Sequence, residues 1–167
     1  MWSAVSDRFS GRRAQLRVAR ALYARGLAVN DEGRVHTSGV PVSHAGLART
    51  IGVDRRVVDQ TCRTILDDTI LSAVFTNLRP QPALRDVASH LGLVALRIAP
   101  DDAAKRGLLS RISTAIAEFD VGIHQAIAED PSFNEEPSLL LVLDKELPDG
   151  LVKRLRRIEG VRSITIV

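Results

Sequence analysis

The stretch LARTIGVDRRVV, residues 47–58, decides the fold of the first half of the chain. A helical pattern stops at Gly52, and Asp54 follows as a residue whose carboxylate can accept hydrogen bonds from the first amides of a new helix. Two short helices joined by a glycine turn make a helix-turn-helix, whose second helix enters the major groove in DNA-binding examples. We expect Ser43 to cap the first helix and the second to run from Arg55 to about Asp67.

The outer face of this second helix carries side chains suited to duplex DNA. Arg55 and Arg56 stand at its start, and Gln60 and Arg63 continue the same face. Guanidinium groups neutralise phosphates and pair with the guanine edge, so these four residues are the candidate DNA-contact set. The alternative interpretation is a solvated helix face. A further alternative is a helix-turn-helix that only mediates dimerisation, as some such modules do.

Charge is unevenly distributed along the 167 residues. Residues 1–90 hold 13 arginines and 8 acidic residues, whereas residues 91–167 hold 10 basic and 12 acidic residues. A basic first part fits a polyanionic partner. The lone cysteine, Cys62, excludes an internal disulfide framework. With no apolar run long enough for a bilayer and no signal-peptide core at the start, we expect a cytoplasmic protein with no membrane partner.

Further elements are expected around the helix-turn-helix. They are a helix over residues 7–25, a hairpin turning at residues 30–33 with Val35 and Val40 on its return arm, a helix over 69–77, and a short connecting helix from Pro82. The pattern changes after Gly92, so the predicted domains are residues 1–91 and 92–167.

The second domain has the order β-α-β-β-α-β, which is typical of the ferredoxin-like arrangement. Strands are predicted at 93–99, 122–130, 138–144 and 161–167. Helices are predicted from Lys105 or Gly107 to Phe119 and from Pro148 onward. The fold class is therefore α+β. Two helices cover only one face of a sheet, so we expect the other face to be solvated or to meet a partner.

Gly-Leu-Leu at 107–109 and Gly-Ile at 122–123 resemble the ACT domain, a regulatory module that binds small ligands. The whole chain resembles a family of archaeal proteins described as predicted regulators of amino-acid metabolism. The stretches that carry this likeness are GVDRRVV (52–58), LRPQPALRDVA (78–88), PDDAAKRGLL (100–109) and GIHQAIAEDP (122–131). The resemblance implies a helix-turn-helix domain, a C-terminal ACT domain, homodimerisation through the latter, and an amino acid bound at the dimer interface.

The resemblance also implies a set of ligand-binding residues. They are Asp101, Asp102, Arg106, Gly107, Leu108, Leu109, Gly122, Ile123, His124 and Gln125. The sequence departs from the ACT pattern at Arg106, where proline is usual, and at His124, where asparagine is usual. Other interpretations stay open: Gly107 also suits a tight turn, and Asp101 and Asp102 also suit helix capping.

No catalytic motif occurs, and neither the histidines nor Cys62 have zinc-ligand spacing. The sequence therefore predicts no enzyme, cofactor or metal site. The predicted function is a ligand-responsive, DNA-binding transcriptional regulator of amino-acid metabolism. The alternative is an allosteric interaction protein that senses an amino acid and controls a biosynthetic enzyme without binding DNA.

Overall fold

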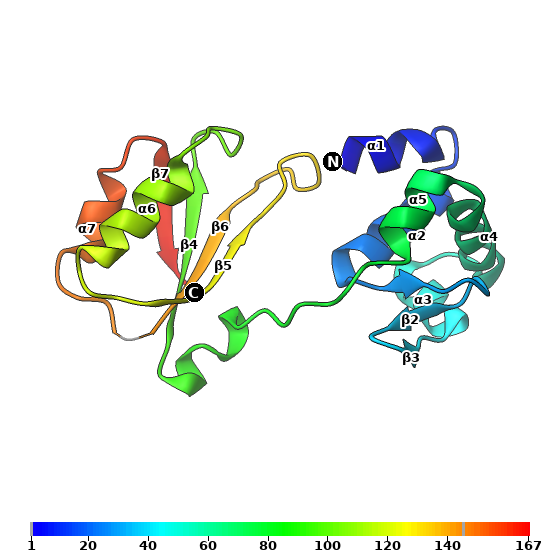
Figure 1. Ribbon diagram of the computed structural model, residues 1–167, viewed down its shortest axis with the longest axis horizontal. Helices are drawn as coiled ribbons and strands as arrows, with labels where there is room; N and C mark the ends of the chain where they lie inside the picture. The colour runs from blue at the N-terminus through cyan, green and yellow to red at the C-terminus, as the bar shows by residue number, and fades with distance from the viewer. Residues whose placement is uncertain (1, 145) are drawn as a thin grey trace. The chain divides into compact units, whose positions relative to one another are not determined.

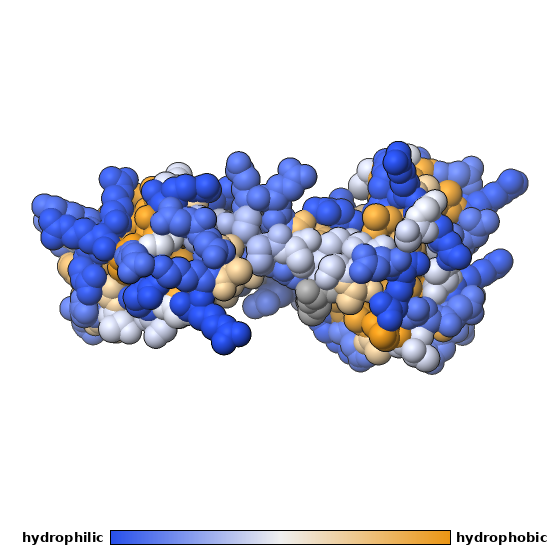
Figure 2. Space-filling view, turned by 90° about the horizontal axis from the view of Figure 1, so that it is seen from above, coloured by the Kyte–Doolittle hydropathy of each residue, from blue (hydrophilic) through white to orange (hydrophobic). Residues whose placement is uncertain are grey.

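A computed structural model describes residues 2–144 and 146–167 (Figure 1). The chain divides into two compact units, Met1–Pro82 and Ala83–Val167, each with its own set of buried apolar side chains. Both helices and antiparallel sheets are present, which confirms the expected α+β class. The face drawn in Figure 2 is largely hydrophilic, with smaller apolar areas on each unit.

Helices dominate the first unit. Its elements are α1 (Trp2–Ser6), the 3₁₀ helix η1 (Asp7–Phe9), α2 (Arg13–Arg25), β1 (Ala28–Val29), β2 (Val35–Thr37), β3 (Val40–Pro41), α3 (His44–Ile51), α4 (Arg55–Asp67) and α5 (Thr69–Phe75). Phe9, Leu22, Ile65 and Phe75 are fully buried at its centre. Burial of such side chains stabilises the fold by about 1.5–3 kcal/mol each relative to exposure.

The expected continuous helix over residues 7–25 is wrong. The chain leaves helical geometry at Ser10, and Gly11 adopts the left-handed conformation with φ +74° before α2 begins at Arg13. At the other end of α2, Gly26 also takes positive φ and caps the helix. A Cβ at Gly26 would lie 2.5 Å from the Arg79 carbonyl oxygen, so this position requires glycine both for its conformation and for the close approach of the chain.

The expected hairpin has an additional strand. Its first turn lies at residues 30–33 as predicted, and the Asn30 side-chain oxygen accepts hydrogen bonds from the Glu32 and Arg34 amides. A second turn with positive φ at Ser38 and Gly39 follows β2. Val40 consequently lies on β3, and the antiparallel order is β1-β2-β3.

The α3–α4 region agrees with the sequence pattern residue by residue. The Ser43 hydroxyl accepts from the Gly46 amide at the start of α3, and Gly52 ends that helix with φ +73°. The Asp54 carboxylate accepts from the Arg56 amide at 2.8 Å and caps α4. The predicted bounds of α4 are therefore confirmed.

The second unit begins with two 3₁₀ turns and continues as a sheet with helices. Its elements are η2 (Arg85–Val87), η3 (Ser89–Leu91), β4 (Val94–Pro100), α6 (Leu108–Ala117), β5 (Ile123–Ala128), β6 (Leu139–Leu143), α7 (Leu151–Arg156) and β7 (Val161–Ile166). The sheet order is β5-β6-β4-β7, with antiparallel neighbours. Helices α6 and α7 lie together on one face (Figure 1), where Ile112, Ile116 and Leu155 pack on Leu96 and Ile98.

The segment before β4 covers part of the opposite sheet face. Ala88 packs on Ala95 and Val142, and the Leu84 amide donates to the Gln125 side-chain oxygen at 2.9 Å. Residues 83–91 thus belong to the second unit, nine residues earlier than the predicted boundary, and they form 3₁₀ turns instead of the expected helix. The expectation that this face is only solvated or bound to a partner is therefore wrong in part, because residues 83–91 of the same chain cover some of it.

The last helix also begins later than expected. Pro148 precedes α7, whose N-terminal flanking residue is Gly150 with φ +90°. Among the described residues, no helix has the length and apolar character required to cross a membrane.

Candidate nucleic-acid interface

The four predicted DNA-contact residues share one exposed face of α4. Arg55, Arg56, Gln60 and Arg63 all point away from the buried side, which is formed by side chains that include Val58. Their positions fall within an arc of about 140° around an ideal helix of 3.6 residues per turn. The helix thus presents three cations and one amide as a continuous strip.

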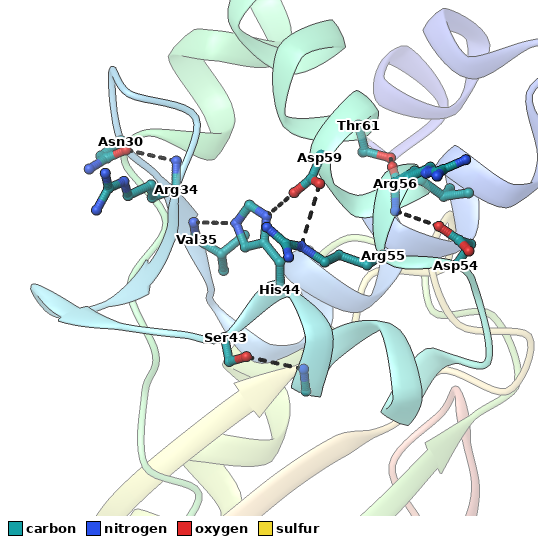
Figure 3. A network of polar contacts seen from close by, with 12 residues as sticks. Asn30, Arg34, Val35, Ser43, His44, Asp54, Arg55, Arg56, Asp59 and Thr61 are labelled. Carbon is teal, nitrogen blue, oxygen red and sulfur yellow. Dashed lines mark hydrogen bonds and ion pairs between the residues drawn. The ribbon is translucent and has the colours of Figure 1, made fainter.

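A partly buried histidine, His44, joins α4 to the hairpin, as Figure 3 shows. His44 Nδ1 lies 2.6 Å from Asp59 Oδ1, and the Val35 amide donates to His44 Nε2 at 3.1 Å. Because Nε2 accepts, the ring proton lies on Nδ1 and is donated to the carboxylate. The His44 side chain is 15% exposed, so both hydrogen bonds are shielded from water. They fix the distance between β2 and the outer face of α4.

Asp59 also holds the first arginine of the strip. Arg55 Nε lies 3.6 Å from Asp59 Oδ2, one helical turn away (Figure 3). An ion pair of this spacing on an exposed helix contributes only a few tenths of a kcal/mol, and the Arg55 side chain is 69% exposed. The contact orients Arg55 without removing it from solvent. Asp59 itself is half-buried and hydrogen-bonded.

A hollow of about 630 Å³ lies between the hairpin, the start of α3 and α4. Its cationic lining residues are Arg34, Arg55 and Arg63, and its acidic ones are Glu32 and Asp59. Sequence reasoning missed Arg34 and His44 as functional candidates. The turn signal before Arg34 predicted its loop, but no local pattern indicates that it faces α4.

Cys62 lies on the buried side of α4. Burial, reinforced by the negative charge of Asp59, raises the pKa of its thiol to about 12. The group is therefore protonated at neutral pH and acts as a small apolar core residue, since only the thiolate is a nucleophile or metal ligand. Across residues 2–144 and 146–167, no cluster of three or more histidine, cysteine or acidic side chains is arranged to hold a metal ion.

The predicted ligand loop of the second unit contains both exposed and structural residues. Gly107 precedes α6 with φ +81°, and an added Cβ would meet no atom within 4 Å. The Asp102 carboxylate accepts from the Ala104 amide at 2.8 Å, and the Asp101 amide donates to the Gly160 carbonyl at 3.0 Å. These bonds form the loop and do not cap α6, so the capping interpretation of the two aspartates is wrong. Leu108 is buried, whereas Leu109 and Arg106 are exposed.

The second predicted ligand stretch, residues 122–125, lies at the other end of the sheet. Ile123 pairs with Leu143, and Leu143 pairs with Val94 at the start of β4, whereas the ligand loop follows the end of β4. Ile123 and His124 are exposed, but Gln125 is engaged by the Leu84 amide. A Cβ at Gly122 would lie 2.5 Å from the Asp144 carboxylate oxygen, so a larger residue there would displace the exposed Asp144 side chain. One chain does not bring the two predicted stretches together.

Comparisons with known proteins give distant structural similarities. No family model matches the sequence, and no curated protein matches it. The ACT domain from GTP pyrophosphokinase of Chlorobium tepidum is 23% identical with a TM-score of 0.36, covering 45% of this chain and 96% of its own. An AsnC family transcriptional regulator from Agrobacterium tumefaciens is 15% identical with a TM-score of 0.31, covering 93% of this chain and 87% of its own.

Proposed function

We propose that the protein is a DNA-binding transcriptional regulator and that α4 is its recognition helix. The observation that carries the proposal is the exposed strip of Arg55, Arg56, Gln60 and Arg63 on a helix that follows α3 through the Gly52 turn. Guanidinium and amide groups in this position suit both phosphate oxygens and the base edges of the major groove. The helix-turn-helix assignment is part of this proposal.

DNA binding is tested by fluorescence anisotropy with a labelled duplex at several salt concentrations. The protein should bind, with affinity falling steeply as salt rises, because bound arginines release counterions from the phosphates. The double variant Arg55→Ala/Arg56→Ala should lose about 1–3 kcal/mol for each base contact removed. Arg13→Ala, an exposed arginine at the start of α2, is the matched control. A double variant that binds as well as the parent would refute the recognition helix.

We propose further that the second unit is an ACT-type module that dimerises and binds an amino-acid effector. The β-α-β-β-α-β order and the sheet order β5-β6-β4-β7 support this assignment. Gly107 leaves space beside the first amides of α6, where a carboxylate is favoured by the helix dipole. Because loop 100–109 and residues 122–125 lie at opposite sheet ends, a shared site needs both stretches from two different copies.

Regulation then follows from a change in dimer geometry. Two recognition helices of a dimer must match half-sites about one DNA turn apart, so an effector that alters their spacing changes DNA affinity. Exposed apolar side chains at Val87, Leu91, Ile166 and Val167 offer surface for subunit contact in the second unit.

Calorimetry against the twenty amino acids tests the effector site. The parent should bind at least one of them, and Gly107→Val should abolish that binding while light scattering still reports a dimer. Gly92→Val is the matched control, because Gly92 also has positive φ and open surroundings. An unchanged affinity in Gly107→Val would refute the site. A protein that binds amino acids but never DNA would instead be the interaction module that controls an enzyme.

A further inference from the structure

The hollow beside α4 has walls from two separate elements that both carry arginine. Arg34 comes from the segment between β1 and β2, whereas Arg55 and Arg63 come from α4. The Arg34 side chain is 75% exposed, so its guanidinium is accessible to a ligand. Cations that face a concave surface from two sides favour an anion between them, because the low-dielectric walls focus their field.

The two walls are held at a fixed separation. His44 binds the Val35 amide on one side and Asp59 on the other, so the residue next to Arg34 is tied to the middle of α4. The Arg34 backbone is also fixed, since its amide donates to the Asn30 side chain and its carbonyl accepts from the Asn30 amide. An anion that enters the hollow therefore meets cations whose backbone positions are already fixed, which lowers the entropic cost of binding.

The two acidic groups of the hollow offset the charge of its three arginines only in part. Asp59 is committed to His44 and Arg55, and Glu32 forms an exposed pair with Arg34 at 3.1 Å. An exposed ion pair contributes little to stability, so Arg34 can exchange Glu32 for a phosphate at small cost. Arg63 has no ion pair within the part of the chain that the structure describes.

We propose that the hollow receives the sugar–phosphate strand of duplex DNA and that Arg34 is a second DNA contact, outside the recognition helix. The inference rests on the proposed DNA-binding function and names an additional contact element for it. With α4 in the major groove, the groove's bordering phosphates lie beside the helix, and backbone contacts of this kind set the register of the helix. The hairpin contact is independent of base sequence because it reaches only phosphate.

The test is anisotropy titration of the full chain with two unrelated duplexes of about 40 base pairs, long enough for half-sites one or two turns apart. Arg34→Ala should weaken binding to both duplexes equally, on the order of threefold to tenfold, and lower the salt slope by about one phosphate. Glu32→Gln should strengthen binding, because it removes the carboxylate that competes with phosphate. Arg13→Ala is the control for net charge, and Trp2 fluorescence verifies that each variant is folded.

The outcomes separate this inference from the function on which it rests. If the parent binds DNA and Arg34→Ala has the same affinity and salt slope, the hairpin does not contact DNA and the inference fails alone. If Arg34→Ala weakens only one of the two duplexes, Arg34 reads bases and the phosphate assignment is wrong. If the parent binds neither duplex, the proposed function fails as well.

Discussion

The two units differ in how their candidate functional residues are assembled. In the first unit, Arg55, Arg56 and Arg63 come from one helix, so their spacing in the sequence fixes their common face. In the second unit, the predicted ligand residues come from a loop and a strand that lie at opposite ends of one sheet. A site within one helix is thus readable from local spacing, whereas a site between distant segments depends on topology and, under the proposed function, on a second copy of the chain.

The substitution with the largest expected loss of stability tests whether the two units unfold independently of each other. Phe75→Ala should cost the first unit about 3–5 kcal/mol, because it leaves a cavity at a fully buried position. Trp2, the single tryptophan, is buried near Tyr23 with ring centroids 5.1 Å apart, so its fluorescence follows unfolding of the first unit. Circular dichroism follows both units. Urea unfolding should show an earlier Trp2 transition and an unchanged second one.

Ile116→Ala is the reciprocal control for that experiment. Ile116 is fully buried under the sheet of the second unit, so its loss should shift only the transition that Trp2 does not report. A single shared transition in both variants would show that the units unfold as one.

The next effect compares two glycines that both have positive φ. Gly26→Ala should cost about 2–5 kcal/mol, since a left-handed alanine is strained and its Cβ also meets the Arg79 carbonyl. Gly107→Ala has only the conformational strain, about 1–2 kcal/mol, because its surroundings are open. Urea unfolding followed by circular dichroism measures both. Equal losses would mean that the chain near Arg79 moves away freely.

A smaller loss of stability is expected from removing the histidine bridge, the pair of hydrogen bonds that His44 makes to the Val35 amide and to Asp59. His44→Ala should cost about 1–3 kcal/mol, because it leaves the Val35 amide and the Asp59 carboxylate without their partly buried hydrogen-bond partner. His124→Ala, an exposed change in the second unit, should stay within about 0.5 kcal/mol. Urea titrations measure the free energy of unfolding of both variants. Similar losses of this free energy in the two variants would argue against the bridge.

The smallest expected effect is a pH dependence of the stability of the first unit, which arises from Asp68. Asp68 accepts from the Leu71 and Ile70 amides and pairs with Arg8, and these contacts hold the pKa of its carboxyl below the usual range. The resulting stability is present above the ordinary carboxyl pKa of about 4 and is lost as pH falls through the lowered pKa. The difference in Trp2 urea midpoint between the parent and Asp68→Asn should therefore shrink from pH 6 to pH 3.

Asp86→Asn is the matched control in the second unit. The pKa of Asp86 is also lowered, through its hydrogen bond and charge interaction with Arg85, but Trp2 does not report that unit. A constant Asp68→Asn difference across the same pH range would contradict the assignment.

Local signals account for the parts of the fold that the sequence predicts well. Ser43, Gly52 and Asp54 cap, end and restart helices through bonds to their near neighbours, so the start of α4 is predicted to the residue. The break at Gly11 was missed because one glycine does not distinguish a left-handed residue from a tolerated helical one. The α+β class and the β-α-β-β-α-β order follow from hydrophobic periodicity alone.

Long-range contacts explain what the sequence does not predict. Residues 83–91 join the second unit through Ala88 on the sheet and through the bond to Gln125, neither of which has a local pattern. His44 and Arg34 gain their places beside α4 from contacts across the fold. The proposed DNA strip was therefore predictable, whereas the hollow beside it was not.

Because the thiol of Cys62 is buried and protonated, its rate of chemical modification can report the local opening of α4. A thiol reagent reacts with the thiolate, and Cys62 forms almost none while α4 stays packed. Modification at neutral pH then proceeds only when the helix opens and the pKa returns toward its ordinary value, so the labelling rate measures the opening equilibrium. DNA that binds the outer face of α4 would slow this rate without touching the sulfur, because a bound helix opens less often.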